Sequence, residues 1–232
     1  MSRFWDEKIS RVDRSPNWKQ NREDFDNFKI NKEQFYKRMD NITTEQIPDE
    51  KLNLDLAAGQ NKREGFKGVD EWPGSDIVWD LFKFPYPFED NSVDEIHCSH
   101  FIEHIPMEYI EVNGRRKDML FAFVDEVHRI LKPGAKATLI FPCATSTRAF
   151  QDPTHRRFIP EQTAYYFTKW WRDANKLDHY NAECDFDFVT GQVINSNWQT
   201  RHQDARTFAY QHYWNVVDDL HFILTKKVIP AK

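Results

Sequence analysis

Residues 51–70 read KLNLDLAAGQNKREGFKGVD, and residues 71–80 continue as EWPGSDIVWD. This stretch predicts three short strands: one over 52–56, a second that ends at Asp70, and a third that ends at Asp80. Four of the seven glycines in the chain fall here, between residues 59 and 74. Glycine is favoured where the backbone takes a positive φ or approaches a ligand closely. We therefore expect a nucleotide-type cofactor across the carboxyl ends of parallel strands.

The composition fits a globular chain, and 232 residues are enough for one large domain. Lys and Arg number 32 against 37 Asp and Glu, and this balance argues against a generally basic nucleic-acid binder. The three cysteines form no C-x-x-C pair, so they predict neither a zinc knuckle nor a disulfide framework. The amino terminus has no apolar leader and no long apolar run occurs. The sequence predicts a soluble, cytoplasmic protein with no membrane partner.

The first 50 residues are polar and evenly charged, and apolar side chains at helical spacing predict one helix over 21–42. We expect residues 1–50 to form a helical extension that packs on the main domain, residues 51–232, or closes over its site as a lid. The link from Gly59 to the second strand is short for a parallel crossover, which usually takes about a dozen residues or more. The first helix of the domain is therefore expected to shrink to about one turn or to be replaced by a loop.

Strand and helix patterns alternate along the rest of the chain. Residues 135–141 form a continuous apolar run, which predicts a strand buried on both faces. The expected elements are strands at 93–99, 135–141, 185–194 and 216–228, and helices at 119–131, 160–174 and 198–213.

Several motifs occur together in a specific order, although each alone is common. They are LDLAAG (54–59), GVD ending at Asp70, DL (80–81), PFEDNSVDEI (87–96), SHFIEHI (99–105) and EVHRILKPG (126–134). Over about residues 51–143 the chain thus resembles class I S-adenosylmethionine-dependent methyltransferases. QDPTHRRF (151–158) is similar to a segment of small methyltransferase-like proteins of phages and bacteria. The resemblance implies an α/β, Rossmann-like sheet with a terminal antiparallel strand pair and a shortened first crossover.

The resemblance also implies a cofactor, S-adenosylmethionine, and residues that bind it. Asp70 would bind the ribose hydroxyls and Asp80 the adenine amino group. Where the family usually has more glycine this chain has two alanines, whose methyl groups narrow the space over the turn. The other implied cofactor residues are Asp55, Ala57, Ala58 and Gly59 at the methionine part, Leu81 beside the adenine ring, and Ser99 and His100 at the sulfonium.

Methyl transfer from a sulfonium mainly requires alignment of the reacting atoms and exclusion of water. A base is needed only when the acceptor nucleophile is protonated near pH 7. The candidate catalytic residues are His104, which would handle protons, and His155, which would take a proton from an acceptor with Asp152 orienting it. The alternative is that these side chains only hold their loop in place by hydrogen bonds.

Residues 100–104, HFIEH, match the H-x-x-E-H motif of inverted zinc peptidases. Such a site needs a third protein ligand, and because the sequence specifies none, it predicts no metal. DNA amino-methylating enzymes carry N/D/S-P-P-Y/F/W where this chain has SHFI, and Pro142-Cys143 follows the fifth strand instead of the fourth. We therefore expect a small or polar acceptor, held by the segments 100–110 and 144–180, and not nucleic acid.

Two other classes of protein share the predicted fold. A cofactor-fold protein that acts as a binding or regulatory module is favoured by the short first crossover and the missing glycines. A nucleotide-dependent oxidoreductase is disfavoured because the chain has no full G-x-G-x-x-G. The sequence does not specify an oligomeric state.

Overall fold

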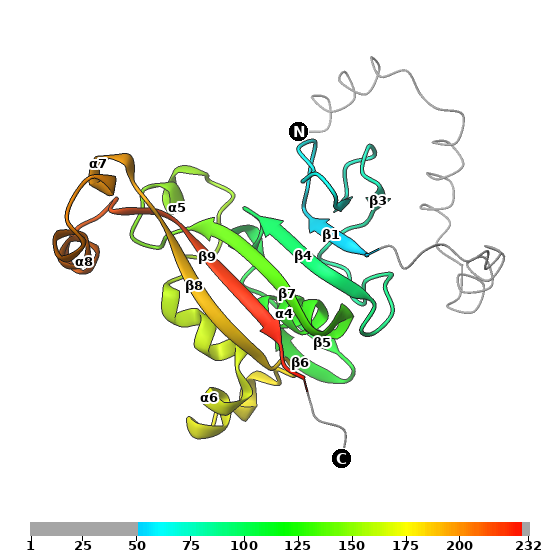
Figure 1. Ribbon diagram of the computed structural model, residues 1–232. Helices are drawn as coiled ribbons and strands as arrows, with labels where there is room; N and C mark the ends of the chain where they lie inside the picture. Colours follow the sequence, from blue (N-terminus) through cyan, green and yellow to red (C-terminus); the bar gives the residue numbers. More distant parts are fainter. Residues whose placement is uncertain (1–50, 229–232) are drawn as a thin grey trace. The chain divides into compact units, whose positions relative to one another are not determined.

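The computed structural model describes residues 51–228, so the helix predicted over 21–42 and its role as a lid lie outside the described residues. Seven strands form one mixed sheet in the order β3-β2-β1-β4-β7-β9-β8 (Figure 1). They are β1 (Asn53–Leu56), β2 (Lys67–Asp70), β3 (Ile77–Val78), β4 (Val93–Ser99), β7 (Leu131–Pro142), β8 (Phe186–Ile194) and β9 (Val217–Lys226).

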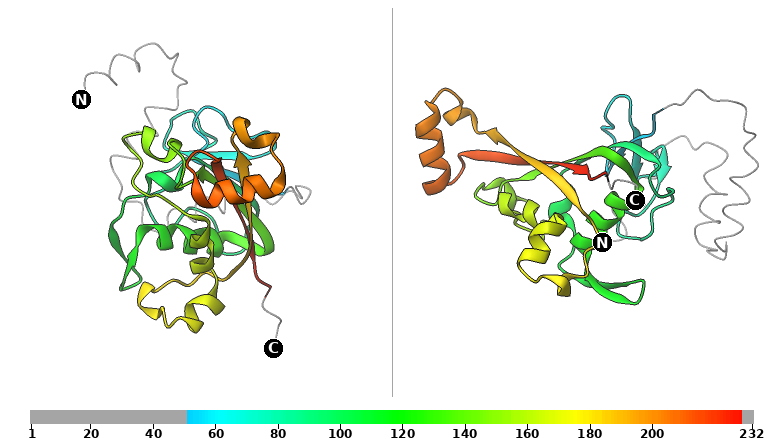
Figure 2. Two further views of the ribbon diagram at one scale, coloured as in Figure 1. Left: turned by 90° about the vertical axis from the view of Figure 1, so that its left-hand side faces the viewer. Right: turned by 60° about the horizontal axis from the view of Figure 1, so that its bottom comes forward.

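Neighbouring strands from β3 to β7 are parallel, whereas β9 is antiparallel to both β7 and β8. The predicted α/β Rossmann-like sheet with a terminal antiparallel pair is therefore confirmed. Strands β8 and β9 extend beyond the rest of the sheet, and α7 (Ser196–Gln199) and α8 (Gln203–His212) lie at their far end (Figures 1 and 2).

The connection from β1 to β2 contains turns and no helix over residues 57–66, as expected for a shortened crossover. Two strand carboxylates hold this loop. Asp55 Oδ2 accepts a hydrogen bond from the Arg63 backbone N–H at 2.8 Å, and Asp70 Oδ2 accepts one from the Gly59 N–H at 3.0 Å. These bonds supply the order that a crossover helix would otherwise provide.

Helix α4 (Met119–Ile130) begins where the Asp118 side chain accepts a hydrogen bond from the Leu120 N–H at 2.8 Å. Its apolar residues, among them Phe123, Val124 and Val127, are buried. Figure 2 shows α4 and α6 (Lys169–Ala174) on the same side of the sheet.

The other short elements are η1 (Ile102–His104), β5 (Tyr109–Val112), β6 (Arg115–Asp118), α5 (Arg148–Gln151), η2 (Glu161–Phe167) and η3 (Asp178–Tyr180). Among residues 51–228, no helix has the length and apolar character that crossing a bilayer requires.

Four expectations about these elements differ from the structure. The strand predicted to end at Asp80 is β3, which ends at Val78. The helix predicted over 160–174 is split at Thr168, whose backbone is extended (φ −107°, ψ 133°). The helix predicted over 198–213 is two helices, α7 and α8. Strand β7 is not buried on both faces: Leu139 and Phe141 are fully buried, but Thr138 and Ile140 are only half-buried.

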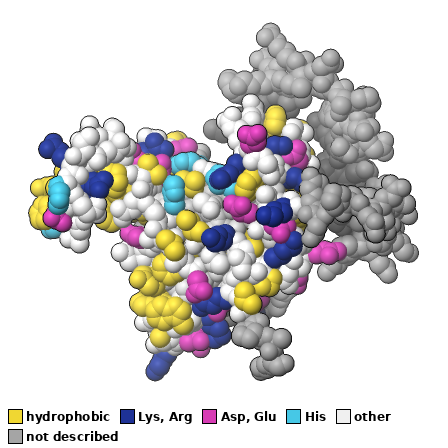
Figure 3. Space-filling model, in the orientation of Figure 1, with side chains coloured by type: hydrophobic (Ala, Val, Ile, Leu, Met, Phe, Trp, Pro, Cys, Tyr) yellow, Lys and Arg dark blue, Asp and Glu magenta, His cyan; other side chains and the backbone are white. Residues whose placement is uncertain are grey.

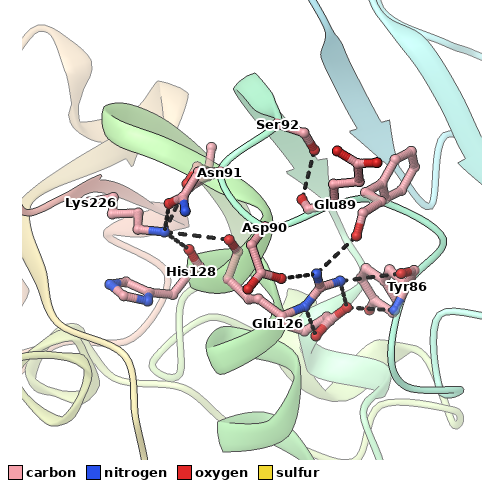
Figure 4. A network of polar contacts seen from close by, with 11 residues as sticks. Tyr86, Glu89, Asp90, Asn91, Ser92, Glu126, His128 and Lys226 are labelled. Atoms are coloured by element: carbon pink, nitrogen blue, oxygen red, sulfur yellow. Dashed lines mark hydrogen bonds and ion pairs between the residues drawn. The ribbon is translucent and has the colours of Figure 1, made fainter.

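A polar network fastens the carboxyl end of α4 to the sheet (Figure 4). Lys226 of β9 is only 8% exposed, and its Nζ donates to Asn91 Oδ1 at 2.7 Å, the His128 carbonyl at 2.6 Å and the Leu131 carbonyl at 2.9 Å. The last carbonyls of a helix lack intrahelical donors, and Lys226 donates a hydrogen bond to one of them, the His128 carbonyl. Because Asn91 lies just before β4, the network fixes the amino edge of the sheet and leaves the carboxyl edge to the candidate site.

Candidate functional site

The carboxyl ends of the parallel strands lie at one edge of the sheet. Leu56, the last residue of β1, pairs with Val69 of β2, and Asp70, the last residue of β2, pairs with Val78 of β3. The Trp79 N–H donates to the Asp70 carbonyl at 3.0 Å. Asp70, the residues just after Val78, and the turn after Leu56 are therefore neighbours at this edge.

Asp70 is half-buried beside the turn. One carboxylate oxygen accepts from the Gly59 N–H at 3.0 Å and the other from the Trp72 N–H at 2.8 Å. An ionised carboxylate offers about four lone-pair positions. Asp70 can therefore hold the turn and still accept hydrogen bonds from two ligand hydroxyls.

The turn after β1 contains Ala57, at a position where the family that this chain resembles usually has glycine. Ala57 has φ +57° and Gly59 has φ +52°. The left-handed region costs an L-residue other than glycine about 1–2 kcal/mol, so Ala57 is held in a glycine conformation. A Cβ placed on Gly59 would have no atom within 4 Å, so the space at this point of the turn is open.

The other predicted cofactor residues on β1 and after β3 already have partners. Asp80 Oδ1 accepts a hydrogen bond from the Phe82 N–H at 2.9 Å. The Leu81 side chain is buried, with the residue only 5% exposed, and the Leu81 carbonyl accepts a hydrogen bond from the Tyr86 hydroxyl. Asp55 is 3% exposed, and its Oδ1 lies 2.7 Å from His97 Nδ1.

Strand β4 ends at Ser99, and the chain turns sharply at His100, which has φ +54°. His100 Nδ1 lies 3.2 Å from Glu103 Oε1, and this hydrogen bond raises the pKa of the His100 imidazole. The His100 side chain is 41% exposed, whereas the Glu103 side chain is 2% exposed. The predicted sulfonium-side residues thus border the buried carboxylate of Glu103, which the sequence analysis placed in the H-x-x-E-H motif but not among the candidate site residues.

The loop after β7 comes back to the residues after β4. The rings of His104 and His155 meet edge to face with their centroids 4.7 Å apart. The Asp152 carboxylate accepts from the Thr154 N–H and hydroxyl at 2.8 and 2.7 Å, and the Thr154 hydroxyl oxygen lies 3.0 Å from His104 Nδ1. Within the described residues, Asp152 therefore connects to His104 through Thr154. Thr154 belongs to the DPTH motif, but the sequence does not show that its hydroxyl links Asp152 to His104, because that contact depends on how the loop folds.

Two hollows lie away from the predicted cofactor residues. One, of about 350 Å³, lies beside α6 and β6 and is mainly polar. The other, of about 250 Å³, is built partly from the segments predicted to hold an acceptor, and its aromatic lining comprises Tyr109, Phe121, Tyr166, Phe167 and Tyr180. Charged side chains of both signs are interspersed on the face shown in Figure 3.

Comparison with known proteins finds similarity in solved structures alone. No family model matches the sequence, and no curated protein matches it. An S-adenosylmethionine-dependent methyltransferase from Archaeoglobus fulgidus is 18% identical, with a TM-score of 0.49, over 76% of this chain and 86% of that chain. One from Mesorhizobium loti is 12% identical, with a TM-score of 0.42, over 78% of this chain and 94% of that one.

Phosphoethanolamine N-methyltransferase 2 of Haemonchus contortus, solved with S-adenosylhomocysteine, is 14% identical with a TM-score of 0.39, over 79% of this chain and 50% of that one. Identities this low concern the fold alone. The strand order of this chain, with β9 between β7 and β8 and antiparallel to both, is that of a Rossmann-like α/β sheet with a terminal antiparallel pair.

Proposed function

We propose that this protein transfers a methyl group from S-adenosylmethionine to a small or polar acceptor. The observation that carries the proposal is Asp70, a carboxylate at the tip of β2 that touches the Gly59 turn at the carboxyl edge of a parallel sheet. Ligands of open α/β sheets bind outside this edge, and an acidic strand tip beside a glycine turn suits the two hydroxyls of a ribose. Asp80 follows the neighbouring strand and suits the adenine amino group.

When bound, S-adenosylmethionine supplies an electrophilic methyl group on a cationic sulfur. The chain's own task is to align an acceptor with that methyl group and to exclude water. Where the acceptor is a hydroxyl or an ammonium, it must also lose a proton. We expect His104 and His155, on the loops after β4 and β7, to receive this proton.

The hollow lined by Tyr109, Tyr166 and Tyr180 supports an acceptor with a flat or apolar part. Arg157 and Asp118 also line it, and they form an ion pair with each other at 3.0 Å. We propose this hollow as the place where the acceptor's body is held. A binding module without transfer is the second candidate, and the strained Ala57 turn favours it.

Calorimetry with S-adenosylmethionine and with its product, S-adenosylhomocysteine, tests the cofactor. Two charge-assisted hydrogen bonds are each worth about 1.5–3 kcal/mol, so Asp70→Asn should weaken binding of both compounds at least about 100-fold. The matched control is Asp187→Asn, because the Asp187 side chain is 76% exposed on β8. Equal dissociation constants for Asp70→Asn and the wild type would refute the ribose assignment.

Transfer is measured separately, with methyl-labelled cofactor and a fractionated lysate. Label appearing in an acceptor fraction supports the enzyme. Cofactor binding with no labelled product in any fraction supports the binding module instead.

A further inference from the structure

The buried carboxylate of Glu103 is incompletely satisfied. Glu103 is 2% exposed, and its Oε2 has no hydrogen-bond partner among the described residues. Its other oxygen lies 3.2 Å from His100 Nδ1. Burying a polar atom without a partner costs free energy, and native proteins rarely leave one unpaired. A cation at Oε2 would remove this cost.

Two imidazole nitrogens lie close to this carboxylate. One potential ligand atom from each of Glu103, His104 and His155 can be chosen so that all three lie within 4.8 Å of one another. His155 Nε2 lies 4.0 Å from Glu103 Oε1. Ligands about 2.0–2.2 Å from a tetrahedral zinc ion lie about 3.4 Å apart. The distances between ligand atoms would need to shorten by at most about 1.4 Å.

The hydrogen bonds of both imidazoles leave Nε2 free to bind a metal. His155 Nδ1 lies 2.9 Å from the Ala149 carbonyl, which can only accept, so Nδ1 carries the proton of the neutral ring. The Thr154 hydroxyl donates to Asp152, so it accepts from His104 Nδ1–H. In each neutral ring the lone pair is then on Nε2. Partners of this kind, a carbonyl and a carboxylate acting through a hydroxyl, orient histidine ligands in metal sites.

We propose that Glu103, His104 and His155 form a binding site for a divalent transition-metal cation, with zinc preferred. Two imidazoles and one carboxylate suit zinc, whereas magnesium prefers oxygen ligands throughout. Three protein ligands leave a fourth tetrahedral position to water or to an oxygen or nitrogen of a bound molecule, as in catalytic zinc sites. The site therefore differs from the H-x-x-E-H motif: it uses Glu103 and His104 of that segment with His155 of the loop after β7, and His100 is not a ligand.

The test uses the full-length protein, freed of metal with a chelator and dialysed, in the absence of S-adenosylmethionine. Titration with Zn²⁺ should show one site, and Co²⁺ should give visible absorption bands at the same stoichiometry. Glu103→Gln and His155→Gln should each weaken Zn²⁺ binding at least about 100-fold, since even partners of ligands contribute about 10–100-fold. His202→Gln is the matched control, because the His202 side chain is 79% exposed.

Thermal melting of each metal-free variant establishes that it folds. If His155→Gln does not fold, His104→Gln replaces it, because His104 lies at a less buried position. Absence of saturable Zn²⁺ binding would overturn the proposal, and so would equal affinity in the ligand variants and the wild type. Binding of Mg²⁺ as tight as that of Zn²⁺ would overturn the assigned metal class. Because the cofactor is absent, failure here leaves the proposed methyl transfer untouched, whereas a bound metal would occupy Nε2 of His104 and His155 and exclude both imidazoles as the base.

Discussion

Replacing Lys226 with methionine should destabilise the protein by about 3 kcal/mol. The change keeps an unbranched, slightly shorter side chain but removes the donor of the hydrogen bonds to Asn91 and His128 (Figure 4) and to the Leu131 carbonyl, at 2.6–2.9 Å. The Leu131 carbonyl is left buried without a donor, which costs about 1–3 kcal/mol, whereas the exposed Asn91 amide and the half-buried His128 carbonyl each lose a hydrogen bond worth about 1 kcal/mol, a gross loss of about 3–5 kcal/mol. Burial lowers the pKa of the Lys226 ammonium, so removing the charge also relieves some desolvation. We take the low end as the net effect.

Urea denaturation followed by tryptophan fluorescence measures this loss, and thermal melting checks it. For a domain of 150–250 residues, about 3 kcal/mol lowers the melting temperature by about 6–12 °C. The control is Lys169→Met, because Lys169 pairs with Asp173 at 2.6 Å on the surface, with side chains 62% and 53% exposed. Such a pair is worth about 0.5 kcal/mol or less. If Lys226→Met shifts the urea midpoint no more than Lys169→Met does, the network does not stabilise the fold as argued.

Two further predictions concern titration and reactivity. Burial lowers the pKa of His128 to about 4, so between pH 6.5 and 4 the unfolded chain binds a proton that the folded chain does not. As the pH is lowered from 6.5 to 4, the free energy of unfolding should therefore fall by about 1–2 kcal/mol, a value discounted for the exposed part of the ring. In His128→Gln, urea denaturation at the same pH values should lack this contribution. Cys98, Cys143 and Cys184 are at most 2% exposed, and burial raises the pKa of Cys98 and Cys184. A thiol reagent should label none quickly in the folded protein and three in denaturant; rapid labelling of the native protein would contradict the packing.

Sequence patterns predicted the parallel half of the sheet well because its signals are local. Short apolar runs, glycines and acidic residues at or near the strand tips mark β1 to β3, and the amphipathic period marks α4. The hairpin of β5 and β6 was missed, since Arg115, Arg116 and Lys117 do not look like a strand. Lys117 is nevertheless 2% exposed and forms an ion pair with Asp125 of α4. Tertiary contacts, not local propensity, therefore place this hairpin.

The split of the helix predicted over 160–174 has a similar origin. No proline or glycine stands near Thr168. The chain is extended there, and the Asp185 side chain accepts from the Lys169 N–H at 2.9 Å where α6 begins. A residue distant in sequence therefore sets the start of this helix, and periodicity alone does not reveal it.

By itself, the sequence placed Asp70 at the end of one strand and Asp80 close after its neighbour, which ends at Val78, because parallel strands present their carboxyl ends at one edge. Only the tertiary structure decided that His155 meets Glu103 and His104. Strand tips follow from short-range patterns of burial and turn chemistry. The meeting of two loops depends on the packing and hydrogen bonds of the whole edge, including Thr154, and no spacing along the chain encodes it.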